Sequence, residues 1–187
     1  MVVAITNSRD ASGLSWSRFA AAAAAFLLIG SAAHAQAAKP NDAQIAHIAY
    51  TAGQIDIANA EQAMKKSKNK AVLEFAQSMA RDHKAVNDQA LALVKKLNVT
   101  PQDNDTSKAI SKGQADKRAE LEKLSGAAFD KAYAQNEAAY HKTVNGALEQ
   151  TLIPSASNAE LKSLLQTGLK IFQGHQQHAE QVAAELK

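Results

Sequence analysis

The pattern of hydrophobic and polar positions along residues 72–97 predicts a helix with one buried face. Small or apolar side chains recur there at alternating steps of four and three residues, which places them on one side of a helix. The only strongly polar member is a histidine, and it needs a partner because burying an unpaired polar group costs on the order of a few kcal/mol. The positions are Val72, Ala76, Met79, His83, Val86, Ala90, Leu93 and Leu97.

A second seam of the same kind lies at residues 161–186. A histidine again stands inside an otherwise small or apolar set with four-three spacing. Two helices of one fold are therefore each expected to bring an imidazole toward the core. The members of this seam are Leu161, Leu165, Gly168, Phe172, His175, Ala179, Val182 and Leu186.

Helical periodicity and its start and stop signals extend over most of the chain. Asn41 with Gln44, and Ser157 with Glu160, have the spacing of capping boxes that open helices, and Pro154 is expected to end one. No segment combines β-branched residues with period-two alternation, so strands are not expected. The predicted helices cover residues 42–66, 70–97, 105–124, 127–152 and 158–186.

These helices predict an all-α fold. The short break after residue 66 makes the first two helices antiparallel neighbours. The third helix has few large apolar residues and is expected to pack on the side of the others. We therefore predict an antiparallel four-helix bundle with one extra amphipathic helix in the long connection.

Residues 1–35 have the pattern of a cleaved secretory signal peptide. Two arginines precede an apolar run at residues 19–29, and Ala33 and Ala35 fit an Ala-x-Ala cleavage site. The run is shorter than the about 20 residues that a membrane-spanning helix needs. The expected organisation is a signal peptide at 1–35, a flexible lead-in at 36–41 and a helical bundle domain at 42–187.

This organisation predicts export to the periplasm or cell envelope, with no transmembrane segment after signal cleavage. The formal net charge of +3 gives no large basic field, so we do not expect nucleic acid as a partner. Four lysines near one turn form a solvated corner that is compatible with weak contact with a membrane surface; no protein partner is indicated. These are Lys65, Lys66, Lys68 and Lys70.

The absence of cysteine narrows the chemistry. It excludes disulfides, thiolate metal ligands and cysteine nucleophiles, so an exported chain must gain its stability from packing. No phosphate-binding loop, Gly-x-Ser-x-Gly or His-Glu-x-x-His sequence is present, and acyl or phosphoryl transfer has no support.

Polar residues within the helical seams form the candidate site. Counting outward from the turns puts Asp56 about one helical turn from His83, and Glu137 close to His175, while His141 shares a helix face with Glu137. If both pairs lie at one level, three imidazoles and carboxylates could bind one Zn, Cu or Fe ion. The alternative is that each histidine is a core residue satisfied by a neighbouring carboxylate or tyrosine.

Several short motifs resemble one bacterial family, called domain of unknown function 4142. They are Gly53-Gln54-Ile55-Asp56, Phe75-Ala76-x-x-Met79-x-x-Asp82-His83, Gly126-x-x-Phe129-Asp130-x-x-Tyr133 with His141, and His175. The resemblance covers nearly all of the chain after the signal peptide. It implies an exported protein with a ferritin-like helical bundle, and members are often labelled as outer-membrane proteins.

This chain departs from the resemblance at two points. The family commonly has Glu where Asp56 stands here. A di-iron carboxylate site uses Glu-x-x-His on two helices, but Ala80 precedes His83 by three residues and Phe172 precedes His175. We therefore expect any metal site to be histidine-rich and mononuclear.

Two functions remain open from the sequence. The first, which we favour at this stage, is a non-enzymatic envelope or stress-related module for binding or structure, with structural histidines. The second is a metal-binding or redox protein that uses His83, His141 and His175 with Glu137 or Asp56. No catalytic residues are assigned, and enzymatic activity is not the favoured hypothesis.

Overall fold

Helices account for nearly all of residues 39–186, the part of the chain that the computed structural model describes. No strand occurs within this range, and the predicted all-α fold is confirmed. The predicted signal peptide at residues 1–35 and the first half of the predicted lead-in, residues 36–38, lie outside the described residues. None of the helices in residues 39–186 is both long enough and apolar enough to cross a membrane.

Side-chain caps open most of the long helices. The Asn41 side chain accepts from the Gln44 backbone N–H, and the Gln44 side chain accepts from the Asn41 backbone N–H, which confirms the first capping box. Asn69 caps the second helix by accepting from the N–H groups of Ala71 and Val72. The bounds are α1 Asp42–Lys66, α2 Lys70–Lys96, α3 Asp105–Glu122, α4 Gly126–Ala147 and α6 Ala159–Glu185.

The sequence predicted that Pro154 ends the fourth helix, but helical structure continues through this proline. A π-helical turn, η1 Leu148–Leu152, follows α4, and a short helical segment, α5 Ile153–Ser155, contains the proline. The wider π turn changes the hydrogen-bond register, so the missing N–H of proline and its ring are accommodated without stopping the chain. The chain becomes extended only at Ala156.

The prediction that Ser157 caps the last helix is also wrong. Asn158, not Ser157, is the cap, and its side chain accepts from the N–H groups of Glu160 and Leu161. Ser157 is held elsewhere, because its backbone N–H donates to the Asp42 carboxylate at 2.8 Å. Asp42 thus joins the start of α1 to the connection before α6.

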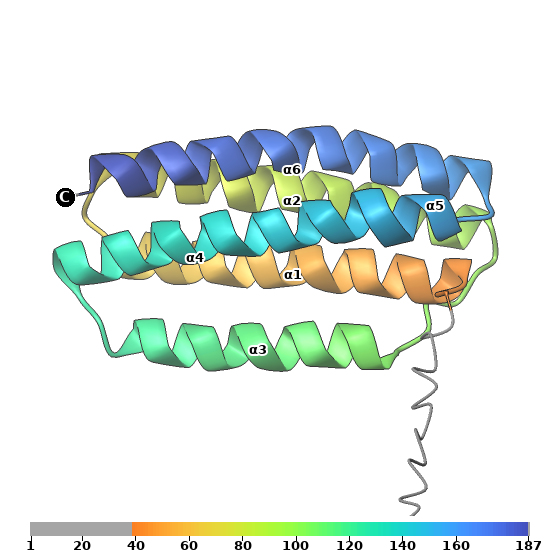
Figure 1. Ribbon diagram of the computed structural model, residues 1–187, viewed down its shortest axis with the longest axis horizontal. Helices are drawn as coiled ribbons and strands as arrows, with labels where there is room; N and C mark the ends of the chain where they lie inside the picture. The colour runs from red at the N-terminus through yellow and green to blue at the C-terminus, as the bar shows by residue number, and fades with distance from the viewer. Residues whose placement is uncertain (1–38, 187) are drawn as a thin grey trace, which may run out of the picture. The chain divides into compact units, whose positions relative to one another are not determined.

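Four of the long helices pack side by side in a closed arrangement. α1 lies along α2, α2 along α6, α6 along α4, and α4 also contacts α1. Figure 1 shows α3 lying along α1 on the outside of this group, as its polar sequence predicted. One ion pair anchors α3 there, because Lys66 lies 3.2 Å from Glu122.

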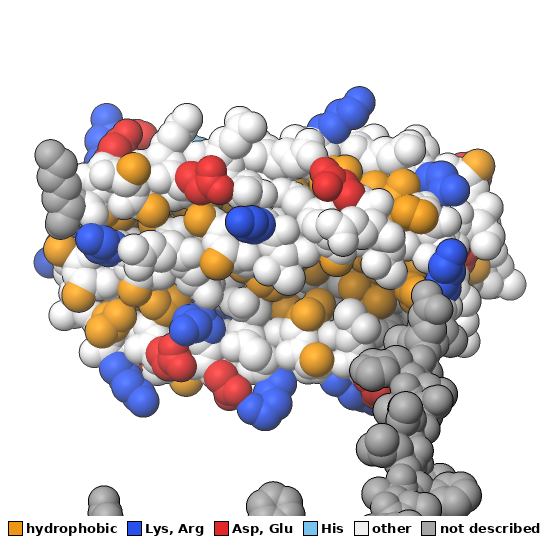
Figure 2. Space-filling model, in the orientation of Figure 1, with side chains coloured by type: hydrophobic (Ala, Val, Ile, Leu, Met, Phe, Trp, Pro, Cys, Tyr) orange, Lys and Arg blue, Asp and Glu red, His pale blue; other side chains and the backbone are white. Residues whose placement is uncertain are grey.

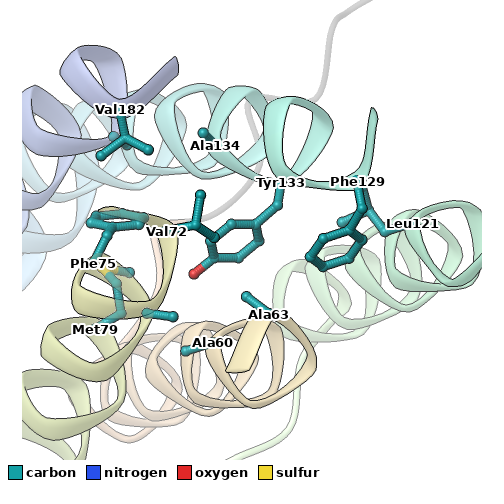
Figure 3. Packing of buried hydrophobic residues seen from close by; sticks show 12 residues of the cluster. Ala60, Ala63, Val72, Phe75, Met79, Leu121, Phe129, Tyr133, Ala134 and Val182 are labelled. Atoms are coloured by element: carbon teal, nitrogen blue, oxygen red, sulfur yellow. The ribbon is translucent and has the colours of Figure 1, made fainter. Parts of the chain in front are cut away.

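The core consists of two apolar clusters with a polar layer between them. One cluster is built around Phe75, Phe129 and Tyr133, and Figure 3 shows Tyr133 reaching from α4 toward α1 and α2. The other is built around Ile45 and Leu165. Apart from Asp130 of α4, the buried polar residues of α1, α2, α4 and α6 occur between the two clusters. These residues are Asp56, Asn59, His83, Asn87, Glu137, His141, Asn145 and His175.

The two halves of the α2 seam differ in burial. Val72 and Met79, on the Phe75 side of the polar layer, are completely buried. Val86, Ala90 and Leu93, beyond His83, are only half-buried. The regular spacing predicted the face correctly but gave no indication of this difference.

Candidate metal centre

All five site residues predicted from the sequence meet in the polar layer. Asp56 comes from α1, His83 from α2, Glu137 and His141 from α4, and His175 from α6. All five are buried. The sequence left open whether the pair Asp56 and His83 lies at the same level as the pair Glu137 and His175. In the structure, the two pairs lie at the same level.

The three imidazoles approach one another nitrogen to nitrogen. His83 Nε2 lies 3.4 Å from His141 Nε2 and 3.3 Å from His175 Nδ1. Imidazole nitrogens bind zinc at about 2.0–2.1 Å, which places two ligand atoms of a tetrahedral ion about 3.3–3.4 Å apart. The spacing of these nitrogens is therefore that of ligands around a single ion.

The outer nitrogens of two rings face acceptors that locate the ring protons. His141 Nδ1 lies 3.0 Å from the backbone oxygen of Glu137, and His175 Nε2 lies 3.1 Å from Asp82 Oδ2. Each acceptor requires an N–H on the nitrogen facing it, so we infer that the inner nitrogens of His141 and His175 carry lone pairs. A proton on His83 Nε2 could serve one of these lone pairs but not both. The inner face of the cluster is suited to a cation.

The Asp56 carboxyl group lies on a further side of the cluster. Its Oδ2 is 3.4 Å from His83 Nδ1, and its Oδ1 is 4.0 Å from His141 Nε2. Neither Asp56 Oδ1 nor His83 Nδ1 has a hydrogen-bond partner within residues 39–186. Leaving a buried polar atom unpaired costs about 1–3 kcal/mol, so these two atoms call for an explanation.

Glu137 is held by one of its two carboxyl oxygens. Its Oε1 accepts from the side-chain amides of Asn59 at 3.0 Å and Asn136 at 3.3 Å. Arg118 of α3 donates to Asn59 at 3.1 Å and so orients that amide. Glu137 Oε2 lies 3.9 Å from His141 Nδ1 and has no hydrogen-bond partner in the described part of the chain.

Burial keeps the imidazoles neutral. Burial lowers the pKa of His141 to about 4, against the opposing effect of its bond to the Glu137 carbonyl. Burial lowers the pKa of His83 well below its usual value, and the neighbouring His141 and His175 lower it further. The pKa of His175 is lowered by burial too, although Asp82 opposes this shift. Neutral imidazole is the form that binds metals.

The carboxyl groups are shifted in the opposite direction. Burial, and then the proximity of Glu137, raise the pKa of Asp56 well above its usual value. Burial raises the pKa of Glu137 to about 7, despite the amide hydrogen bonds that favour its charged form. Charge is therefore costly on every member of the cluster, and a bound cation would stabilise the carboxylates and displace their protons.

These donors fit the ions expected from the sequence. Three imidazole nitrogens, with carboxylate oxygens adjacent to them, suit Zn, Cu or Fe, whereas Mg²⁺ and Ca²⁺ prefer oxygen ligands throughout. One atom each from His83, His141 and His175 lie within 4.8 Å of one another, as do atoms from Asp56, Glu137 and His141. His141 belongs to both groups.

A model of the family described as Domain of unknown function (DUF4142) matches residues 29–182. The match covers most of the 187 residues. The chain belongs to this family. The resemblance noted in the sequence is thus confirmed, while no curated protein and no solved structure matches the chain.

In this DUF4142 member, the short motifs that carried the resemblance supply the polar layer and the cluster beside it. Asp56 closes the first motif and His83 closes the second. Tyr133, from the third, lies in the adjacent apolar cluster and its buried hydroxyl has no hydrogen-bond partner within residues 39–186. The proximity of Glu137 and Asp56, added to burial, raises the pKa of Tyr133 well above its usual value.

Sequence reasoning missed two residues of the centre in this DUF4142 member. Asp82 was noted only as a neighbour of His83, yet its carboxylate binds His175 on another helix. Phe172 was assigned to the apolar seam, but its ring stacks on His83 with centroids 4.5 Å apart and planes 6° from parallel. The Asp-His dipeptide was the one available signal, because an acidic residue beside a candidate ligand can orient a second one.

Proposed function

We propose that this protein binds one transition-metal ion in its helical core, with His83, His141 and His175 as ligands. The observation that carries the proposal is the convergence of three imidazoles: His141 Nε2 and His175 Nδ1 lie 3.4 and 3.3 Å from His83 Nε2, and one nitrogen from each ring lies within 4.8 Å of the other two. Two of them are inferred to present lone pairs to the same point, which a protein interior does not tolerate without a cation or proton between them.

Asp56 is the fourth ligand in this proposal. Its Oδ1 lacks a hydrogen-bond partner within residues 39–186 and lies 4.0 Å from His141 Nε2. A set of three nitrogens and one oxygen favours Zn²⁺, with Cu²⁺ and Fe²⁺ as the competing ions. A bound ion of this kind supplies Lewis acidity, and with copper or iron also electron transfer.

The surrounding residues orient the ligands and manage the protons. Asp82 and the Glu137 backbone oxygen hold the rings of His175 and His141 with their lone pairs inward. Glu137 Oε2, 3.9 Å from His141, is placed to keep a proton near the centre or to join Asp56 as a carboxylate ligand.

The proposal selects the metal-binding alternative over structural histidines. Structural histidines would have hydrogen-bond partners for their ring nitrogens among neighbouring residues. The outer nitrogens of His141 and His175 have such partners. His83 argues against a purely structural role, because its Nδ1 has no hydrogen-bond partner in residues 39–186 and its Nε2 faces two other imidazoles. We therefore propose the metal-binding alternative in place of the module with structural histidines that the sequence favoured.

Two further parts of the proposal concern cellular location and architecture. The signal-peptide pattern in residues 1–35 supports export to the periplasm or cell envelope. The closed packing of α1, α2, α4 and α6, with α3 in the long connection, supports a ferritin-like four-helix bundle.

Metal analysis of the untagged protein, purified without chelator and then challenged at neutral pH with Zn²⁺, Cu²⁺ or Fe²⁺, tests the metal site. We expect about one ion per chain and a higher Tm, since a ligand at 1,000 times its Kd stabilises by about 4 kcal/mol. His141→Ala should lose both effects. His178→Ala, at an exposed histidine of α6, is the matched control. Clearly sub-stoichiometric binding of all three ions would refute the proposal.

A further inference from the structure

A cavity lies in the half of the core that contains Ile45 and Leu165. Its volume is about 100 Å³, and its wall combines residues from α1, α2, α3, α4, η1 and α6. Along α6 the lining extends from Leu161 to Phe172, which corresponds to about 16 Å at 1.5 Å per residue. A small volume over such a length describes a narrow space that runs along the helices.

The lining of this cavity is almost entirely apolar. Alanines on several helices, including Ala46, Ala52 and Ala90, leave space that larger side chains would fill. A buried water needs two to four polar partners, which such a wall does not provide. An apolar cavity of about 150 Å³ engineered in another protein stays dry and binds benzene. The present cavity therefore suits hydrocarbon better than water.

One end of the cavity reaches the histidine cluster. Phe172 lines the cavity and also stacks on His83, with centroids 4.5 Å apart. Tyr140 lines it as well, and its ring centroid lies 6.3 Å from that of His141. Only one layer of aromatic rings separates the cavity from the proposed metal ligands.

The other side of the cavity lies toward the surface. Thr106 of α3 and Thr143 of α4 belong to the lining and are exposed. Figure 2 shows hydrophobic side chains in the crevice between α3 and the helices beside it. This position also accounts for the incomplete burial of Val86 and Ala90, which face the cavity instead of a packed core.

We propose that this cavity binds the unbranched alkyl chain of a small amphiphile. The polar end remains at the exposed side near α3 and α4, and the methyl end lies against Phe172 and Tyr140. The narrow cavity admits a single alkyl chain, and its apolar wall disfavours polar groups along that chain. Binding of the chain depends on the cavity alone; its placement beside a metal ion rests on the proposed function.

The probe is the series 1-butanol, 1-pentanol and 1-hexanol, titrated into the metal-free full chain and followed by NMR of the methyl groups. Each added methylene should raise affinity about fourfold, which corresponds to about 0.8 kcal/mol per buried CH₂. 1,6-Hexanediol has the same length with a polar far end and should bind no better than 1-butanol. Equal affinity along the series, or equal binding of the diol, would overturn the proposal.

Cavity-filling variants localise the effect. Ala90→Leu fills the cavity from α2 and should reduce 1-hexanol affinity at least tenfold, while Ala92→Leu, at an exposed alanine of the same helix, should not change it. Ala46→Leu fills the cavity from α1 and serves if Ala90→Leu does not fold. Unchanged 1-hexanol binding in a folded cavity variant would refute this site.

The orientation of the chain is tested without metal. Nuclear Overhauser effects should connect the 1-hexanol methyl group to the Phe172 ring, and its CH₂–OH group should lack them. The opposite pattern would refute the orientation. Failure of the protein to bind Zn²⁺, Cu²⁺ or Fe²⁺ would refute the proposed function and leave these alcohol results unchanged, so the two failures are distinguishable.

Discussion

His175 Nε2 of α6 lies 3.1 Å from Oδ2 of Asp82, a residue of α2 that is 93 positions away in the sequence. The contact turns the His175 ring so that Nδ1 lies 3.3 Å from His83 Nε2. Arg81 holds the same carboxylate through two hydrogen bonds, and its guanidinium helps to keep the pKa of Asp82 below its usual value. Asp82 is therefore a charged group at the edge of the cluster that orients an inner ligand.

Asp82→Ala should weaken metal binding without removing a ligand. Loss of a group that orients a ligand typically lowers metal affinity 10- to 100-fold. Asp82→Asn keeps an acceptor oxygen for His175 and should lose less. Isothermal titration with Zn²⁺ measures both, and Asp88→Ala, at an exposed aspartate of α2, is the control. Equal affinities in wild type and Asp82→Ala would contradict the orienting role.

His83→Leu should separate metal binding from folding. In the metal-free protein the change removes a buried nitrogen that has no hydrogen-bond partner among residues 39–186, so the free energy of unfolding should stay equal or rise. The increase in Tm on adding metal should disappear. Thermal melting with and without Zn²⁺ measures both effects, and a metal-induced increase that persists in this variant would count against His83 as a ligand.

Glu137→Gln should change how the stability of the metal-free protein depends on pH. Because burial raises the pKa of Glu137 to about 7, this group contributes stability that is fully present below its unfolded pKa near 4.5. The contribution is lost as pH rises toward and through about 7. Between pH 4.5 and 7.5, wild type should lose about 3 kcal/mol relative to Glu137→Gln, at 1.36 kcal/mol per pKa unit.

Urea unfolding of both proteins at several pH values measures this difference. Using the difference between the two proteins cancels the titration of the histidines, which opposes that of Glu137. The same substitution at Glu149, an exposed residue of η1, is the control. A difference between wild type and Glu137→Gln that is constant from pH 4.5 to 7.5 would show that this carboxyl is not held protonated by the fold.

Two helical glycines should respond in opposite directions to alanine. A Cβ at Gly53 would clash with the side-chain amide of Asn87, so Gly53→Ala must displace a buried amide and should destabilise by about 1–2 kcal/mol. A Cβ at Gly146 meets nothing within 4 Å, and Gly146→Ala should stabilise by up to about 1 kcal/mol. Chemical denaturation compares them.

A double variant provides the control for this pair. Adding Asn87→Ala to Gly53→Ala removes the clash, so the two changes together should cost less than the sum of the two single changes. Additive effects would mean that the close approach of α1 and α2 at Gly53 does not limit packing there.

Local sequence patterns were enough to predict the helices and the kinds of side chain that enter the core. The seam spacing that placed His83 and His175 among apolar residues follows from the 3.6-residue helical repeat, which is a local property. The capping box of Asn41 and Gln44 is local as well. The start of the last helix shows where local rules failed. The Asp42 carboxylate accepts from the backbone N–H groups of both Ser157 and Asn158, a long-range contact that local spacing does not encode, and Asn158 is the cap.

Which polar residues meet, and what surrounds them, depends on how the helices pack. Whether Asp56 and His83 share a level with Glu137 and His175 depends on the long connection through α3, whose offset no local pattern encodes. The Asp82–His175 contact and the cavity beside Phe172 are likewise properties of helix packing. Periodicity fixes which face of a helix turns inward, whereas the depth and spacing between faces arise only when the helices pack.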